Sequence, residues 1–210
     1  MINWLLTSSS SQDRAVSRPS CRTAGQFEGC RELVDFLVDL VRRETIRTVV
    51  LGASWNGYGS KIIERDGRSF QINQREGADA FYANLEDYVS RLQELGAKVY
   101  LVLPVPNHRR FDPATMVTRS MFGFDVAPDV NIPVETNALQ ALNEEATTKL
   151  RRIEERTGAV LLNPLDDLCE ADYCSAFFED GKPKFSSGLH LRPAFVRQHL
   201  HFLDEPLAGP

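Results

Sequence analysis

The sequence predicts an α/β protein in which a mainly parallel sheet is covered by helices on both faces. Three segments with the composition of buried strands, each preceded by an amphipathic helical pattern, carry this prediction. At 210 residues, with 42% hydrophobic and 25% charged residues, the chain is large enough for one sizeable core. We therefore expect a single domain over residues 1–210.

The expected strands are apolar and rich in β-branched residues. They cover residues 45–53, 97–105 and 158–163, and charged residues are almost absent from their second halves. A further strand is expected at residues 2–7, with no helix or strand before it. We therefore expect the natural start to lie upstream and the first strand of the sheet to be missing from this sequence.

The expected helices show apolar residues at spacings of three and four. A glycine at position 96 is expected to end the second helix, and Gly158 follows the third. By contrast, residues 110–133 contain three prolines, and their apolar residues show no regular spacing. This pattern predicts a long surface excursion. The apolar faces of the three helices are Leu33, Val34, Leu37, Leu40 and Val41; Phe81, Leu85, Tyr88, Val89 and Leu92; and Leu139, Leu142, Ala146, Leu150 and Ile153.

Charge and hydropathy exclude several classes of function. A net charge of −5 and a pI near 5.4 argue against a nucleic-acid partner, which would need a clustered basic face. The densest basic pairs, at 42–43 and 151–152, lie on helical patterns and are interpreted as solvated. No apolar run is long enough to span a membrane, and the first residues lack the features of a signal peptide. We expect no cofactor.

The four cysteines form two close pairs, Cys21 with Cys30 and Cys169 with Cys174. A disulfide within each pair would close a small loop and restrict the unfolded chain. Metal binding is the alternative, but neither pair has the C-x2-C spacing of a zinc site, so no metal is expected. Two disulfides imply an oxidising compartment.

Candidate site residues follow the ends of the expected strands, where open α/β sheets form their sites. His190 lies in a Gly/Ser-rich loop and is the candidate general base, since a neutral imidazole can accept a hydroxyl proton near pH 7. Gly52 and Asn107 are candidate donors to an oxyanion, and Trp55 is a candidate substrate contact. The alternatives are that Trp55 packs in the core and that Asn107 belongs to a turn.

The sequence offers no convincing nucleophile. It contains neither a Gly-Asp-Ser block nor a G-x-S-x-G elbow. Ser54 follows a strand but lacks a sharp turn framed by glycines, and the serine run 8–11 is more consistent with a turn.

Taken together, these segments resemble the SGNH hydrolase-like domain fused to membrane acyltransferase-3 proteins of bacterial surface-polysaccharide O-acetylation. The resemblance covers about residues 4–203. It rests on both cysteine pairs, on the segments 49–58 and 100–106, and on His190-Leu191, in this order and spacing. It implies a flavodoxin-like three-layer α/β/α fold, a periplasmic or extracellular location, and a Ser-His-Asp triad that handles acetyl groups on sugars.

Matched to this family, His190 falls on the catalytic histidine. Ser187 falls on the triad aspartate three positions earlier, and Arg192 on the serine that commonly follows His-Leu. The resemblance implies that the nucleophile block lies before residue 1. The implied partners are an acetylated glycan or the acyl-donating membrane domain.

Two functions follow from this comparison. The first is an acetyl-transferring or esterase domain, incomplete or inactive in the given sequence. The second is a degenerate SGNH module that binds a glycan or a partner protein without catalysis, which the residues at positions 187 and 192 favour.

Overall fold

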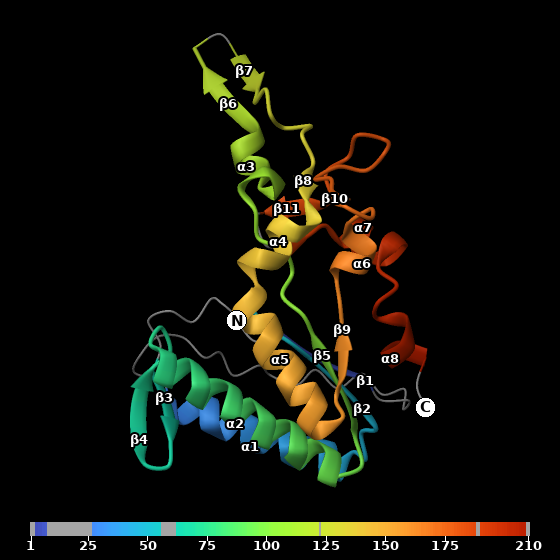
Figure 1. Cartoon of the computed structure of the whole chain (residues 1–210). Coiled ribbons are helices and arrows are strands. Elements are labelled where there is room, and N and C mark those ends of the chain that lie inside the picture. Colours follow the sequence, from blue (N-terminus) through green and yellow to red (C-terminus); the bar gives the residue numbers. More distant parts are fainter. Residues whose placement is uncertain (1–2, 8–26, 56–61, 122, 188–189, 209–210) are drawn as a thin grey trace. The chain divides into compact units, whose positions relative to one another are not determined.

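The computed structural model describes residues 3–7, 27–55, 62–121, 123–187 and 190–208 (Figure 1). The chain divides into two compact units, both discontinuous in sequence. Unit 1 comprises Met1–Leu103, Ala146–Leu162 and Glu205–Pro210; unit 2 comprises Pro104–Glu145 and Asn163–Asp204. Neither unit is therefore a simple N-terminal or C-terminal domain.

Unit 1 contains a four-stranded sheet in the order β1-β2-β5-β9. Strands β2 (Thr48–Gly52), β5 (Lys98–Val102) and β9 (Val160–Leu162) are parallel, in agreement with the predicted segments. Strand β1 (Asn3–Thr7) pairs with β2 in the antiparallel direction. The described sheet is thus mainly parallel, with one antiparallel edge strand.

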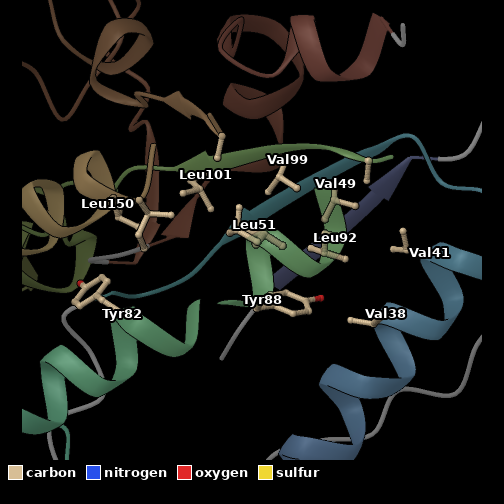
Figure 2. Close-up of a cluster of buried hydrophobic side chains, with 14 of the residues drawn as sticks. Val38, Val41, Val49, Leu51, Tyr82, Tyr88, Leu92, Val99, Leu101 and Leu150 are labelled. Atoms are coloured by element: carbon tan, nitrogen blue, oxygen red, sulfur yellow. The ribbon is translucent and has the colours of Figure 1, made fainter. Parts of the chain in front are cut away.

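Three long helices of unit 1 pack on one face of this sheet. They are α1 (Phe27–Arg43), α2 (Arg75–Glu94) and α5 (Glu144–Thr157). Figure 2 shows their side chains meeting alternate residues of the strands, because residues two apart in a strand point to the same face. The labelled members of this core are Val38, Val41, Val49, Leu51, Tyr82, Tyr88, Leu92, Val99, Leu101 and Leu150.

The opposite face of the sheet carries Val50 and Tyr100, which are also buried. Here the Tyr100 hydroxyl donates to Glu205 Oε1 at 3.1 Å, and Lys98 Nζ donates to the same oxygen at 2.8 Å. Glu205 belongs to α8 (Asp204–Ala208). Helical residues therefore contact both faces of the sheet, as the α/β prediction requires.

The predicted end of the second helix is confirmed at Gly96. Its φ of 83° is a left-handed conformation that glycine adopts without strain. Its N–H donates to Gln93 O at 2.8 Å, and Ala97 N–H donates to Leu92 O at 3.2 Å. These are the two bonds of a Schellman motif. They satisfy the last carbonyls of α2 and turn the chain into β5.

Unit 1 also contains a hairpin of β3 (Ile62–Arg65) and β4 (Arg68–Gln71). Its turn is Asp66-Gly67, and both residues have positive φ, which suits a tight two-residue hairpin connection. The Arg65 guanidinium joins the hairpin to α2 through Asn84 Oδ1 at 2.7 Å and Asp87 Oδ2 at 2.8 Å.

Unit 2 consists of short elements around a second core. Phe111 and Phe185 stack at its centre, with ring centroids 4.8 Å apart and an interplanar angle of 2°. The elements are α3 (Pro113–Met116), β6 (Val117–Ser120), β7 (Gly123–Val126), β8 (Val134–Glu135), α4 (Thr136–Leu142), α6 (Leu165–Leu168), β10 (Tyr173–Cys174), β11 (Phe185–Ser187), β12 (His190–Leu191) and α7 (Pro193–His199).

The prediction of a long surface excursion over residues 110–133 is wrong in part, although the described residues of β6 and β7 are exposed. Phe111 and Met116 of this segment are buried in the unit 2 core, and β6 and β7 form an antiparallel hairpin. Residues of both hairpin strands are exposed on both faces, and each strand has only four residues, too few for an alternation of apolar and polar residues to predict a strand.

The third predicted helix is two helices. Helix α4 ends at Leu142, Asn143 has φ −118° and ψ 10°, and α5 begins at Glu144. The break turns Leu142 out of the core, where 57% of it is exposed. The other predicted apolar positions of this segment are buried: Leu139, Ala146, Leu150 and Ile153.

Candidate functional site

His190 stands at the start of β12, in a short antiparallel ladder with β11. Ser187 is the register partner of His190, and Phe185 is the partner of Leu191. Ser186 Oγ donates to the His190 carbonyl at 3.0 Å, and Arg192 N–H donates to the Lys184 carbonyl at 2.9 Å. Hydrogen bonds therefore tie the backbone from His190 to Arg192 to residues 184–186.

The structure brings together the two residues that the resemblance to the SGNH hydrolase-like domain places at triad positions. Ser187 Oγ lies 2.7 Å from His190 Nδ1, within hydrogen-bond distance. The His190 ring is exposed, and Ser187 is half-buried. No further hydrogen bond to this ring is found within the described part of the chain.

A hydroxyl and a carboxylate differ in how they control the tautomer of the His190 ring. A carboxylate only accepts, so it holds the proton on Nδ1 and leaves the Nε2 lone pair free. A serine hydroxyl can donate or accept, so it is compatible with both tautomers. The Ser187–His190 pair therefore orients the imidazole without selecting the tautomer that serves as a base.

Lys184 directly precedes β11 of this ladder and connects it to the core of unit 2. The residue is buried, and its Nζ donates to the Leu168 carbonyl at 3.0 Å. Nζ also lies 5.9 Å from the centroid of the Phe195 ring. Burial lowers the pKa of Lys184, against a smaller opposing effect of Glu170. The sequence does not reveal this burial, since a single lysine before an apolar residue gives no sign of it.

The predicted disulfide between Cys169 and Cys174 is confirmed, with Cα atoms 4.1 Å apart. It closes the turn between α6 and β10, where Glu170 and Tyr173 exchange two backbone hydrogen bonds of 2.8 Å each. Residue 21 lies outside the described residues, so the Cys21–Cys30 disulfide stays a prediction.

Trp55 lies in the core of unit 1, with 6% of its surface exposed. Its Nε1–H donates to the Val102 carbonyl at 2.7 Å, and its ring meets Phe81 edge to face at 6.5 Å. The indole has one hydrogen-bond donor, which this bond uses. These contacts favour the packing alternative over a substrate contact.

The two candidate oxyanion donors lie in different units. Gly52 is the last residue of β2 in unit 1, half-buried and paired in register with Asn3. Asn107 is exposed in unit 2, one residue before His108. Their roles toward an oxyanion stay predictions.

His108 is a residue whose environment the sequence did not reveal. Its Nδ1 accepts the Arg110 N–H at 3.2 Å, and its ring meets Phe111 at a centroid distance of 5.8 Å. Partial burial, and secondarily the Arg110 charge, lower the pKa of His108. The imidazole therefore caps a short helical turn at Arg109–Phe111 in its neutral form.

No helix in the described ranges is long and apolar enough to cross a membrane. Among the same residues, no group of three or more metal-ligating side chains gathers that could hold an ion.

Comparison with known proteins identifies a family and a structural neighbour of this chain. No curated protein sequence matches the chain. The solved structure is the periplasmic domain of the lipopolysaccharide acetyltransferase of Salmonella ser. Paratyphi A, with 12% sequence identity and a TM-score of 0.42. That match covers 75% of this chain and 55% of the solved chain. This chain therefore spans about half the length of the solved chain. Residues 7–204 match the family described as "SGNH domain (fused to AT3 domains)", and the chain therefore belongs to this family.

Proposed function

We propose that this chain takes part in the handling of O-acetyl groups on a cell-surface polysaccharide, by transfer or by ester hydrolysis, with His190 as its proton-transfer group and without a nucleophile of its own. The observation that supports this proposal is the 2.7 Å contact between Ser187 Oγ and His190 Nδ1. It holds the imidazole at Nδ1, the nitrogen through which a triad carboxylate orients a general base.

The substitution at position 187 sets the efficiency of this base. A hydroxyl carries no negative charge, so it does not stabilise the imidazolium that forms when His190 accepts a proton. In a serine protease, loss of the triad carboxylate's charge lowers kcat by roughly 10⁴. We therefore expect His190 to be a weak base compared with a triad histidine.

The sequence supplies no Gly-Asp-Ser block and no G-x-S-x-G elbow. Without such a nucleophile, the isolated chain should show negligible turnover of a chromogenic acetyl ester. A fluorophosphonate probe should label no serine stoichiometrically. Stoichiometric labelling at one serine would contradict the inferred lack of a nucleophile.

The proposed compartment is the periplasm or the cell exterior. The Cys169–Cys174 disulfide supports it, because structural disulfides form and persist in oxidising compartments. The family description, with its fused AT3 domains, supports an acyltransferase domain as the acyl-donating partner.

The catalytic proposal is tested in the cells that make this protein. The O-acetyl content of the surface polysaccharide is measured by NMR for the wild type and for His190→Gln. We expect a changed O-acetyl content in this variant and a smaller change of the same sign in Ser187→Ala. Equal content in all three strains, with equal protein levels, would overturn the role of His190 in acetyl handling.

A second candidate function is binding of a glycan or a partner protein without catalysis. It is favoured by Ser187 and Arg192. By resemblance, the SGNH hydrolase-like family has an aspartate and a serine at these two positions. Calorimetric titration with an O-acetylated oligosaccharide and with its de-acetylated form tests it. Binding that depends on acetylation, together with unchanged O-acetyl content in the His190→Gln strain, would favour this function.

A further inference from the structure

The β6–β7 hairpin of unit 2 exposes apolar side chains that no described residue covers. Met121 is 95% exposed, Phe124 73%, Val126 67% and Val117 45%. In the described part of the chain, the hairpin is a separate two-stranded sheet. A two-stranded ribbon with no packed face is marginally stable in water, and a gathered apolar patch marks an interaction site.

The register of the hairpin separates two chemically different faces. Val117 pairs with Val126 and Arg119 with Phe124, and residues two apart share a face, so these four side chains lie together. Asp125 pairs with Thr118 on the opposite face. We call Val117, Arg119, Phe124 and Val126, with Met121 beyond the strand ends, the apolar hairpin face.

The charge on the apolar hairpin face indicates its partner. Arg119 is exposed and is the only charged member of this face, whereas the carboxylate of Asp125 belongs to the other face. A guanidinium beside aromatic and aliphatic side chains matches the boundary of a bilayer. There the apolar groups enter among the acyl chains, and the cation binds lipid phosphate.

We propose that the apolar hairpin face docks on the surface of an anionic phospholipid bilayer. Each strand has four residues, or roughly 14 Å of length, enough to place Met121 and Phe124 below the headgroups while the base of the hairpin stays in water. The whole chain carries a net charge of −5, so general electrostatic attraction does not bring it to such a surface. Binding depends on this local face and is independent of acetyl handling by His190.

The test is co-sedimentation of the full chain with vesicles of phosphatidylglycerol and phosphatidylethanolamine. We expect binding of the wild type and at least tenfold weaker partitioning of the double variant Met121→Ser/Phe124→Ser, because burial of such side chains supplies most of the affinity. Arg119→Gln should weaken binding to these vesicles and have little effect with phosphatidylcholine alone, which carries no net charge.

Leu142→Ser is the matched control, since Leu142 is a comparably exposed apolar residue of the same unit, on α4. It should bind vesicles as the wild type does. Circular dichroism and the Tm verify that each variant is folded. No wild-type partitioning at millimolar lipid, or equal loss in Leu142→Ser, overturns the proposal. A concentration-dependent dimer without vesicle binding, abolished in the double variant, would assign the face to a second copy of the chain.

Discussion

Ser187 Oγ lies 2.7 Å from His190 Nδ1, at the two positions where the resembling family carries its triad aspartate and histidine. The Ser187 hydroxyl makes a hydrogen bond to Nδ1, as a triad carboxylate would, but it carries no charge. Orientation of the imidazole and stabilisation of the imidazolium are two separate effects of a triad carboxylate. This pair retains the first effect alone.

Ser187→Asp should shift the His190 ring toward the tautomer with the proton on Nδ1. The carboxylate can only accept a hydrogen bond, whereas the serine hydroxyl also donates one. Long-range ¹H–¹⁵N NMR spectra of the imidazole measure this shift directly. Ser187→Ala is the matched control, because it removes the bond without adding charge. An unchanged tautomer ratio in Ser187→Asp would show that residue 187 does not control the ring.

The disulfide of unit 2 should be a measurable source of stability. Replacing both Cys169 and Cys174 by serine should lower the free energy of unfolding by about 2 kcal/mol, since a loop of this size restricts the unfolded chain only modestly. Urea denaturation of the two proteins measures this difference. Equal stability would mean that the bond does not constrain the unfolded chain.

Alkylation before and after reduction, followed by mass spectrometry, tests the pairing itself. We expect Cys169 with Cys174 and Cys21 with Cys30 in oxidised protein. Four free thiols, or pairing between the two pairs, would contradict this expectation and weaken the assignment to an oxidising compartment.

Trp55→Phe separates the structural role of Trp55 from a role in substrate binding. The variant keeps an aromatic ring in the unit 1 core but loses the bond from Nε1 to the Val102 carbonyl. We expect a loss of about 1–3 kcal/mol in the free energy of unfolding, from the hydrogen bond and from the smaller ring. Ser54→Ala, at the adjacent exposed position, should change stability by less than about 0.5 kcal/mol. Unchanged stability with weakened oligosaccharide binding would instead assign Trp55 to the substrate.

The parallel strands and long helices of unit 1 could be predicted because their patterns come from burial. Val49, Leu51, Val99 and Leu101 are buried in runs of apolar residues, and Gly96 has the positive φ that a helix-ending glycine signals. In unit 2 the same approach failed. Its elements are short, and the four-residue strands of the β6–β7 hairpin are too brief for their alternation to predict a strand.

Only the part of the candidate site that depends on residues close in sequence could be predicted. His190 and Ser187 are three residues apart, so their contact is local and follows from a short antiparallel ladder. Burial of Lys184 and the cap formed by His108 depend instead on residues brought together by the fold, such as Leu168 and Phe195 around Lys184. One sequence gives no sign of such contacts.

His108 should make the stability of the protein sensitive to mild acid. Burial, and then the Arg110 charge, lower the pKa of His108 in the folded chain, so the unfolded chain binds more protons as the pH falls below about 6.5. The contribution of His108 is therefore fully present above that pH and is lost as the pH falls through the folded-state pKa. Protonation of Nδ1 also removes the acceptor for the Arg110 N–H.

His108→Asn keeps a side-chain acceptor at this position but does not titrate. Between pH 7 and pH 5 we expect the Tm of the wild type to fall more than that of His108→Asn, since only the wild type must protonate a partly buried side chain. Asn107→Ala, one residue away and exposed, should keep the wild-type pH dependence. Parallel Tm curves for the wild type and His108→Asn, measured by differential scanning calorimetry, would show that protonation of His108 does not oppose folding.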